Sequence, residues 1–154
     1  MGDPAGIGPE LCLRLLHEIE ESDCLDQIPL IYGDSNILNK VSKRIGVPIS
    51  TRVVSAVAQL DRPAIVHCPT NDLCDVVPGQ VNPQCGEASL QYCLQAITDA
   101  QQNKVDAIVT CPISKEALSL AGHVYPGHTE LFSEHFSNSE TCLLYTSDAA
   151  DEGH

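Results

Sequence analysis

MGDPAGIGPE, residues 1–10, is a glycine-rich stretch that runs directly into a helical pattern. Pro9 suits the first turn of a helix, where its missing N–H removes no hydrogen bond. Turns of this kind normally follow a strand in α/β proteins, so we expect a natural strand before Met1. Apolar spacing then predicts a helix over residues 9–21. Its expected buried stripe is Leu11, Cys12, Leu15, Leu16 and Ile19.

The rest of the chain alternates between short apolar runs and longer periodic segments. Strands are predicted at residues 28–32, 49–54, 64–67 and 105–110. Helices are predicted at residues 86–102, 114–121 and 129–136, and a further helix is predicted that Asp34 or Ser35 can cap and that Gly46 ends. This alternation predicts an α/β fold with substantial parallel pairing. Residues 71–84 contain two prolines and a glycine, and they predict a loop that is the best candidate for a crossing between two lobes.

Composition limits the partners. The 154 residues hold 8 Lys and Arg against 21 Asp and Glu, a formal net charge of −13. Such a surface repels phosphate backbones and anionic lipid, which argues against nucleic acid and membrane partners. The eight cysteines lack the spacing of zinc or redox motifs, so they predict unpaired thiols in a reducing, cytoplasmic environment. His17 and His67 show no partner pattern and are interpreted as structural.

Three segments can carry chemistry, and each lies at the start of a predicted helix. The glycines of residues 2–9 allow backbone amides to approach an anion, or they serve only a tight turn. Ser114 can cap the helix that follows the predicted strand 105–110, and Lys115 places a cation where the helix dipole favours an anion. That arrangement suits an anionic ligand, and the structural alternative is a solvated lysine.

The third segment contains the turn Pro126-Gly127, which places His128 and Thr129 at the start of a predicted helix. An imidazole and a hydroxyl beside free backbone amides can bind hydroxyl or phosphate oxygens. The structural alternative makes Thr129 a helix N-cap and His128 a turn residue.

Taken in order, GDPAGIGPE (2–10), CPISKEAL (111–118) and AGHVYPGHTELF (121–132) resemble the 4-hydroxythreonine-4-phosphate dehydrogenase family of vitamin B6 biosynthesis. The resemblance covers essentially all of residues 1–141. Family members often carry a small residue and Asn where this sequence has Cys111 and Ser114, which leaves the exact role of Ser114 open.

The resemblance implies an isocitrate-dehydrogenase-like α/β fold with two lobes, a homodimer, and a site in the cleft. It implies NAD-dependent oxidation of a phosphorylated hydroxy acid, 4-phosphooxy-L-threonine, followed by decarboxylation and assisted by zinc, magnesium or cobalt. By position, His128 and Thr129 match the substrate-binding pair of the family, and Lys115 and Ser114 are further candidates for substrate binding. The metal ligands and most cofactor contacts are expected beyond residue 141, so the chain is expected to be an N-terminal half without a metal site.

Residues 142–152 are similar to one reading frame of a sequencing adapter, so residues 142–154 are expected to be a non-native tail. Three other functions stay open. A sister dehydrogenase acting on threonate or erythronate 4-phosphate would carry the same motifs. A phosphate-binding acyltransferase of related fold would need no NAD and gives no reason for the PGHTE turn. A protein that only binds a ligand is disfavoured by the expected tail.

Overall fold

The computed structural model describes residues 1–21, 27–58, 60–70, 73 and 75–136. Its elements in chain order are α1 (Gly8–Glu21), β1 (Leu30–Gly33), α2 (Ser35–Ile45), β2 (Arg52–Val54), β3 (Ala64–His67), α3 (Pro83–Gln101), α4 (Lys115–Leu120) and α5 (His128–His135). The predicted α/β class is confirmed. The expected tail, residues 142–154, lies outside the described residues. No described helix is long and apolar enough to cross a membrane.

Three parallel strands form the sheet, in the order β1-β3-β2. The middle strand, β3, pairs on both sides, so that Ile65 lies opposite Ile31 of β1 and Val53 of β2. The first three residues of β3 are buried and apolar, as expected for a parallel strand that is covered on both faces. Because the strands are parallel, their carboxyl ends meet at the same edge of the sheet.

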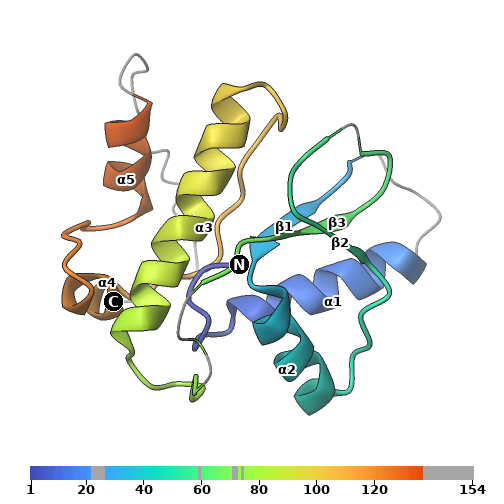
Figure 1. Cartoon of the computed structure of the whole chain (residues 1–154), viewed down its shortest axis with the longest axis horizontal. Coiled ribbons are helices and arrows are strands. Elements are labelled where there is room, and N and C mark those ends of the chain that lie inside the picture. The colour runs from blue at the N-terminus through green and yellow to red at the C-terminus, as the bar shows by residue number, and fades with distance from the viewer. Residues whose placement is uncertain (22–26, 59, 71–72, 74, 137–154) are drawn as a thin grey trace, which may run out of the picture.

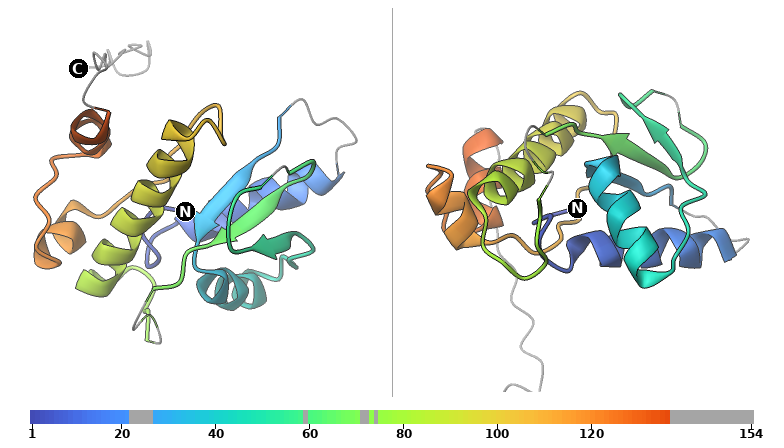
Figure 2. Two further views of the ribbon diagram at one scale, coloured as in Figure 1. Left: turned by 45° about the horizontal axis from the view of Figure 1, so that its top comes forward. Right: turned by 60° about the horizontal axis from the view of Figure 1, so that its bottom comes forward.

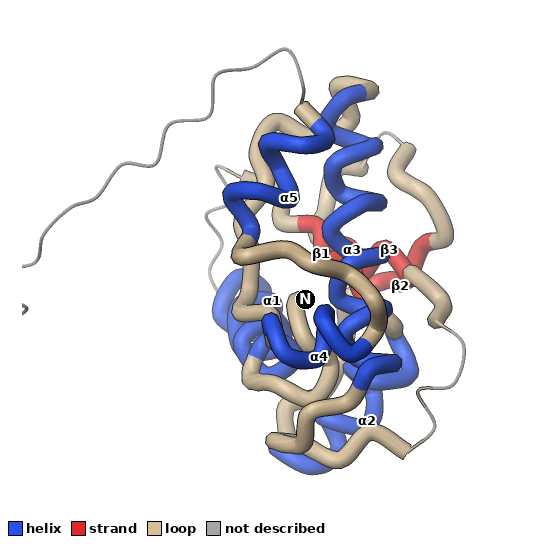
Figure 3. The backbone as a smooth tube through the Cα atoms, turned by 90° about the vertical axis from the view of Figure 1, so that its left-hand side faces the viewer, coloured by secondary structure: helices blue, strands red, loops and turns tan. Residues whose placement is uncertain are grey.

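The helices lie in two groups around this sheet. Helices α1 and α2 pack against each other on one side, and α3 lies alongside β1 (Figures 1 and 2). Helices α4 and α5 lie on the side of α3 away from the strands (Figure 3). The loop before α3 therefore carries the chain from the sheet to the second group of helices, although residues 71, 72 and 74 are outside the described part.

The predicted buried stripe of α1 was partly wrong. Cys12, Leu13 and Leu16 are buried, whereas Leu11 is 45% exposed and Leu15 is 44% exposed. Apolar residues occupy more than one face of this helix, so spacing alone could not say which face meets the core. The positions of α2 and the sheet decide it, and the face that contains Cys12 and Leu16 is the buried one.

Helix α2 begins and ends as its sequence predicts. Asp34 is its N-cap, since Asp34 Oδ1 accepts a hydrogen bond from the Asn36 amide at 2.8 Å. Gly46 closes it in the left-handed conformation with φ 72°, and its N–H donates to the Ser42 carbonyl. Asp34 is only 4% exposed, and its Oδ2 also accepts from the Thr70 hydroxyl at 3.3 Å. One carboxylate thus joins the start of α2 to the segment after β3.

Replacing Asp34 by Ala should lower the free energy of unfolding by about 1–2 kcal/mol, because an N-cap and a buried acceptor are both lost. Asp34→Asn should lose much less, since an amide oxygen caps nearly as well as a carboxylate. Urea unfolding of both variants measures this. Equal losses for the two variants would contradict the capping role.

Helices α3, α4 and α5 share a second apolar core. It is formed by Leu90 and Ile97 of α3, Leu118 of α4 and Leu131 of α5. Gly86 permits the close packing of α3 on α4, because a Cβ at this position would lie 2.2 Å from the carbonyl oxygen of Ala117. Helix α3 starts three residues before its prediction, since Asn82 caps it and Pro83 occupies its first turn.

The strand predicted at residues 105–110 was wrong for this structure. No strand is assigned there, and Val109 is 95% exposed. None of the three described strands pairs with this segment, so its backbone groups lack the ladder that a buried strand requires. The apolar run alone indicated a strand, but apolar residues form one only where a neighbouring strand is present.

Candidate functional site

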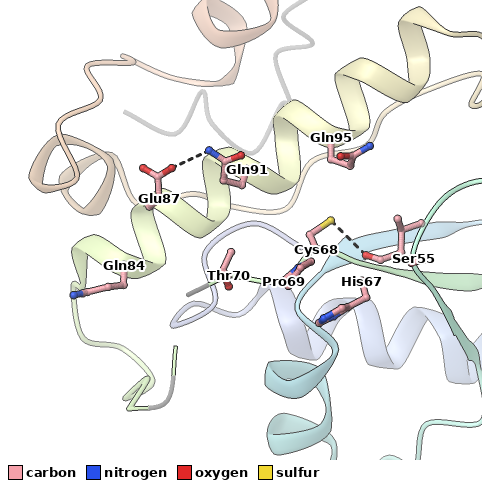
Figure 4. A pocket seen from close by; sticks show the side chains of 10 residues that line it. Ser55, His67, Cys68, Pro69, Thr70, Gln84, Glu87, Gln91 and Gln95 are labelled. Carbon is pink, nitrogen blue, oxygen red and sulfur yellow. Dashed lines mark hydrogen bonds between the residues drawn. The ribbon is translucent and has the colours of Figure 1, made fainter. Parts of the chain in front are cut away.

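A groove of about 460 Å³ opens at the carboxyl edge of the parallel sheet. Ligands of open α/β sheets bind at this edge, and the volume falls within the range of small-molecule sites. One wall comes from the end of β3 and the residues after it, and the other comes from α3 (Figure 4). The lining residues are Ser55, Val66, His67, Cys68, Pro69, Thr70, Gln84, Glu87, Gln91 and Gln95.

Helix α3 supplies a polar row to this groove. Its four members recur at helical spacing, so they share one face of α3: Gln84, Glu87, Gln91 and Gln95. The Gln91 amide donates to Glu87 Oε1 at 2.8 Å. His123 Nε2 lies 2.6 Å from Glu87 Oε2, and the hydrogen bonds from Gln91 and His123 lower the pKa of Glu87.

His67 stands opposite this row at the end of β3. Its Nδ1 accepts a hydrogen bond from the Ser35 amide at 3.1 Å and lies 3.0 Å from the Ser35 hydroxyl. An accepting Nδ1 leaves the proton of a neutral imidazole on Nε2. The sequence interpretation of His67 as structural missed its place in the groove, although a polar residue directly after a buried strand could have pointed to it.

The groove suits a polar ligand without strong negative charge. Its ten lining residues offer amides, hydroxyls, an imidazole and one carboxylate, and none of them is Lys or Arg. Phosphate groups are normally held by cationic side chains or by free backbone amides. The groove therefore fits a hydroxyl- or amide-bearing group better than a phosphate.

The predicted site residues of the second segment lie at the start of α4. Ser114 is its N-cap, with Oγ accepting from the Ala117 amide at 3.1 Å, as the sequence predicted. The Lys115 side chain is exposed, and no ion pair within the described residues involves it. Lys115 is therefore a cation free to meet an anion.

The third segment places His128 at the first residue of α5, with Gly127 as the N-cap. Thr129 is not the N-cap, and it is partly buried in the first turn. His128 packs its ring on Phe132 with 6.4 Å between centroids. Its Nε2 is buried and makes no hydrogen bond within the described part of the chain, and burial lowers the pKa of the imidazole. A buried polar atom without a partner normally calls for a ligand or another explanation.

The four predicted residues form two pairs, Ser114 with Lys115 at the start of α4 and His128 with Thr129 at the start of α5. Among the described residues, no hydrogen bond or ion pair joins Ser114 or Lys115 to His128 or Thr129. Helices α4 and α5 both pack on α3 through Leu118 and Leu131. The segment between α4 and α5 approaches the groove where His123 Nε2 lies beside Glu87 Oε2.

The glycines at the chain start are used for packing. A Cβ at Gly2 would lie 2.4 Å from the Pro112 carbonyl oxygen, and a Cβ at Gly8 would lie 1.9 Å from the Met1 carbonyl oxygen. Asp3 is buried, accepts from the Ala5 amide at 2.8 Å, and has its pKa raised by burial. A side chain at either glycine would clash with backbone, so the close packing of this turn explains the two glycines.

The described residues alone do not fit a metal site either. No three His, Cys, Asp or Glu side chains within them converge as a metal would require.

Comparison with known proteins places this geometry in a family. The profile of the pyridoxal phosphate biosynthetic protein PdxA matches residues 26–150. D-threonate 4-phosphate dehydrogenase of Salmonella typhimurium is 37% identical over 153 residues, 95% of this chain and 46% of the relative. 4-hydroxythreonine-4-phosphate dehydrogenase of Sulfurihydrogenibium sp. is 31% identical over 134 residues, 87% of this chain and 40% of the relative.

A solved structure supports the fold. The crystal structure of 4-hydroxythreonine-4-phosphate dehydrogenase from Klebsiella pneumoniae superimposes with a TM-score of 0.78 at 33% identity, covering 89% of this chain and 43% of the other. The predicted family fold is thereby confirmed. The chain spans less than half the length of these relatives.

Proposed function

The chain belongs to the pyridoxal phosphate biosynthetic protein PdxA family, and from this premise we propose that it supplies part of the active site of an NAD-dependent dehydrogenase. The substrate is a four-carbon hydroxy acid phosphorylated on its fourth carbon. The observation that carries the proposal is His128 at the start of α5, whose buried Nε2 has no hydrogen-bond partner among the residues that the structure describes. A homodimer and a cytoplasmic location belong to the same proposal.

The charge and polarity of each side chain suggest which part of the substrate it contacts. Lys115, exposed at the start of α4, attracts the anionic substrate, and the Ser114 and Thr129 hydroxyls can donate to its oxygens. His128, which burial keeps neutral at pH 7, gives the substrate one hydrogen bond through Nε2. NAD, when bound, accepts the hydride from the carbon that bears the oxidised hydroxyl. The amides and hydroxyls of the groove suit a neutral part of that cofactor.

Besides erythronate 4-phosphate, two substrates are candidates, and they differ at the second carbon. 4-Phosphooxy-L-threonine carries an ammonium there, whereas D-threonate 4-phosphate carries a hydroxyl. The relative named for D-threonate 4-phosphate is 37% identical and the relative named for the threonine derivative is 31% identical. The higher identity to the D-threonate 4-phosphate relative is the observation that makes this acid the second candidate substrate.

The test uses the complete protein that carries residues 1–136 and measures NADH formation by absorbance. We expect reduction of NAD with one of the two phosphorylated acids. The same acid without its phosphate should lose roughly ten- to a hundredfold in kcat/KM, since charge-assisted hydrogen bonds of about 1.5–3 kcal/mol disappear. Failure to reduce NAD with either acid, or with D-erythronate 4-phosphate, would reject the proposal.

A further inference from the structure

Two cysteines that are far apart in the sequence meet in the structure. Cys12 lies on α1 and Cys111 lies in the loop before α4, and their sulfur atoms are 3.8 Å apart. Cys12 is 5% exposed, and Cys111 is more accessible. Among the described residues these thiols contact each other directly, and no bond joins them.

The surroundings hold the two thiols in place. The Cβ of Cys111 lies within 3.1 Å of where a Cβ would stand at Gly2 or at Gly8, so the cysteine is seated against the glycine turn. The Asp3 amide donates to the Pro112 carbonyl at 3.0 Å and fastens the neighbouring residue. A disulfide needs sulfurs about 2.05 Å apart. Forming the bond therefore requires the two sulfurs, now 3.8 Å apart, to move closer together.

Thiol–disulfide exchange requires a thiol that ionises readily, and Cys111 of this pair meets that requirement. The hydrogen bond from the Cys12 thiol lowers the pKa of Cys111, and the same contact raises the pKa of Cys12. Burial raises the pKa of Cys68 to about 11 and that of Cys85 to about 11, and it also raises the pKa of Cys93. The thiolate is the attacking form, so Cys111 is the most reactive of the described cysteines.

We propose that Cys12 and Cys111 form a reversible disulfide and that this pair is a redox modification site. The oxidant is a small disulfide of the glutathione type. The Cys111 thiolate attacks one sulfur of the oxidant, breaks its S–S bond and releases one thiolate, which takes a proton. Cys12 then loses its proton and attacks Cys111 Sγ, which releases the second small thiol. Two protein thiols are oxidised, and one small disulfide is reduced to two thiols.

The consequence is a cross-link between α1 and the loop that leads into α4. Cys111 stands three residues before Ser114, so the bond fixes the segment that carries the first turn of α4. A reducing cytoplasm keeps such a pair in the dithiol form until small disulfides accumulate, as is usual for redox-sensing cysteines. The inference does not depend on the proposed function, because it concerns only two thiols and their surroundings.

The test treats the 154-residue chain with oxidised glutathione and maps its tryptic peptides. Cleavage after Arg14 and Lys104 leaves Cys12 alone in peptide 1–14 and Cys111 alone in peptide 105–115. We expect these two peptides joined by a disulfide that dithiothreitol reverses, with a rise in Tm of about 5–15 °C. A protein in which Cys111 carries only glutathione, or pairs with another cysteine, would overturn the proposal.

Three variants complete the experiment. Cys12→Ser should leave Cys111 as a stable glutathione adduct, and Cys111→Ser should leave Cys12 unmodified because it is buried. Cys93→Ser is the matched control and should not change the yield of the cross-linked peptides. Circular dichroism of each reduced variant verifies folding. Peptide 105–115 joined by a disulfide to another cysteine-containing peptide in Cys12→Ser, in a yield equal to the cross-link of the parent chain, would also reject the assignment.

Discussion

Asp99→Ala is expected to lower the free energy of unfolding by about 1–3 kcal/mol, because it leaves the buried Tyr32 hydroxyl without its acceptor. Asp99 on α3 is 2% exposed. Its Oδ2 accepts from the Tyr32 hydroxyl of β1 at 3.0 Å, and its Oδ1 lies 3.2 Å from Lys104 Nζ. Burial and the bond to Asp99 raise the pKa of Tyr32, so the phenol stays a donor. This carboxylate ties the second group of helices to the sheet.

Two further variants separate the contribution of the Asp99 charge from that of its hydrogen bond to Tyr32. Asp99→Asn keeps an acceptor for Tyr32 and loses only the charge, so it should cost clearly less than Asp99→Ala. Asp106→Ala is the control, since Asp106 is exposed and should change stability by no more than about 0.5 kcal/mol. Urea unfolding of the three variants checks the order. A loss below about 1 kcal/mol for Asp99→Ala would show that the contact seen here is weak in solution.

His128→Ala in the complete enzyme should lower kcat/KM by roughly ten- to a hundredfold, which corresponds to a lost polar contact of about 1.5–3 kcal/mol. The His128 Nε2 is buried, and no described residue forms a hydrogen bond with it. Its loss should therefore weaken substrate binding and leave the fold and the metal content unchanged. Steady-state kinetics, metal analysis and thermal unfolding of one purified variant measure all three quantities.

Each alternative role for His128 gives a different result. Loss of metal would make it a ligand, and loss of stability with intact activity per folded molecule would make it structural. His135→Ala is the control on the same helix, because His135 Nδ1 already contacts the Leu131 carbonyl at 2.8 Å. Its kcat/KM should stay within about twofold of the parent value, the range expected for changes away from the chemistry.

Sequence alone determined the elements whose causes are local. Asp34 and Gly46 bound α2 as predicted, and Ser114 caps α4, because each cap bonds to amides within a few residues of itself. β3 was placed at the predicted residues, because a short buried run of β-branched residues needs no distant information to be recognised. The three ordered motifs were also enough to indicate the family.

Only the tertiary structure decided which faces and which distant residues meet. It buried Cys12, Leu13 and Leu16 of α1 rather than Leu11 and Leu15, since the burial of a face depends on what packs against it. It left residues 105–110 without a strand, because a strand exists only beside a partner.

The sequence alone could not indicate the groove or the thiol pair, for the same reason. His67 and Gln91 both line the groove, and the sulfurs of Cys12 and Cys111 lie 3.8 Å apart, although each pair is far apart along the chain. The spacing of residues along a sequence encodes the periodicity of one element. It does not encode the distance between elements, which is set by how the helices pack on the sheet and on one another.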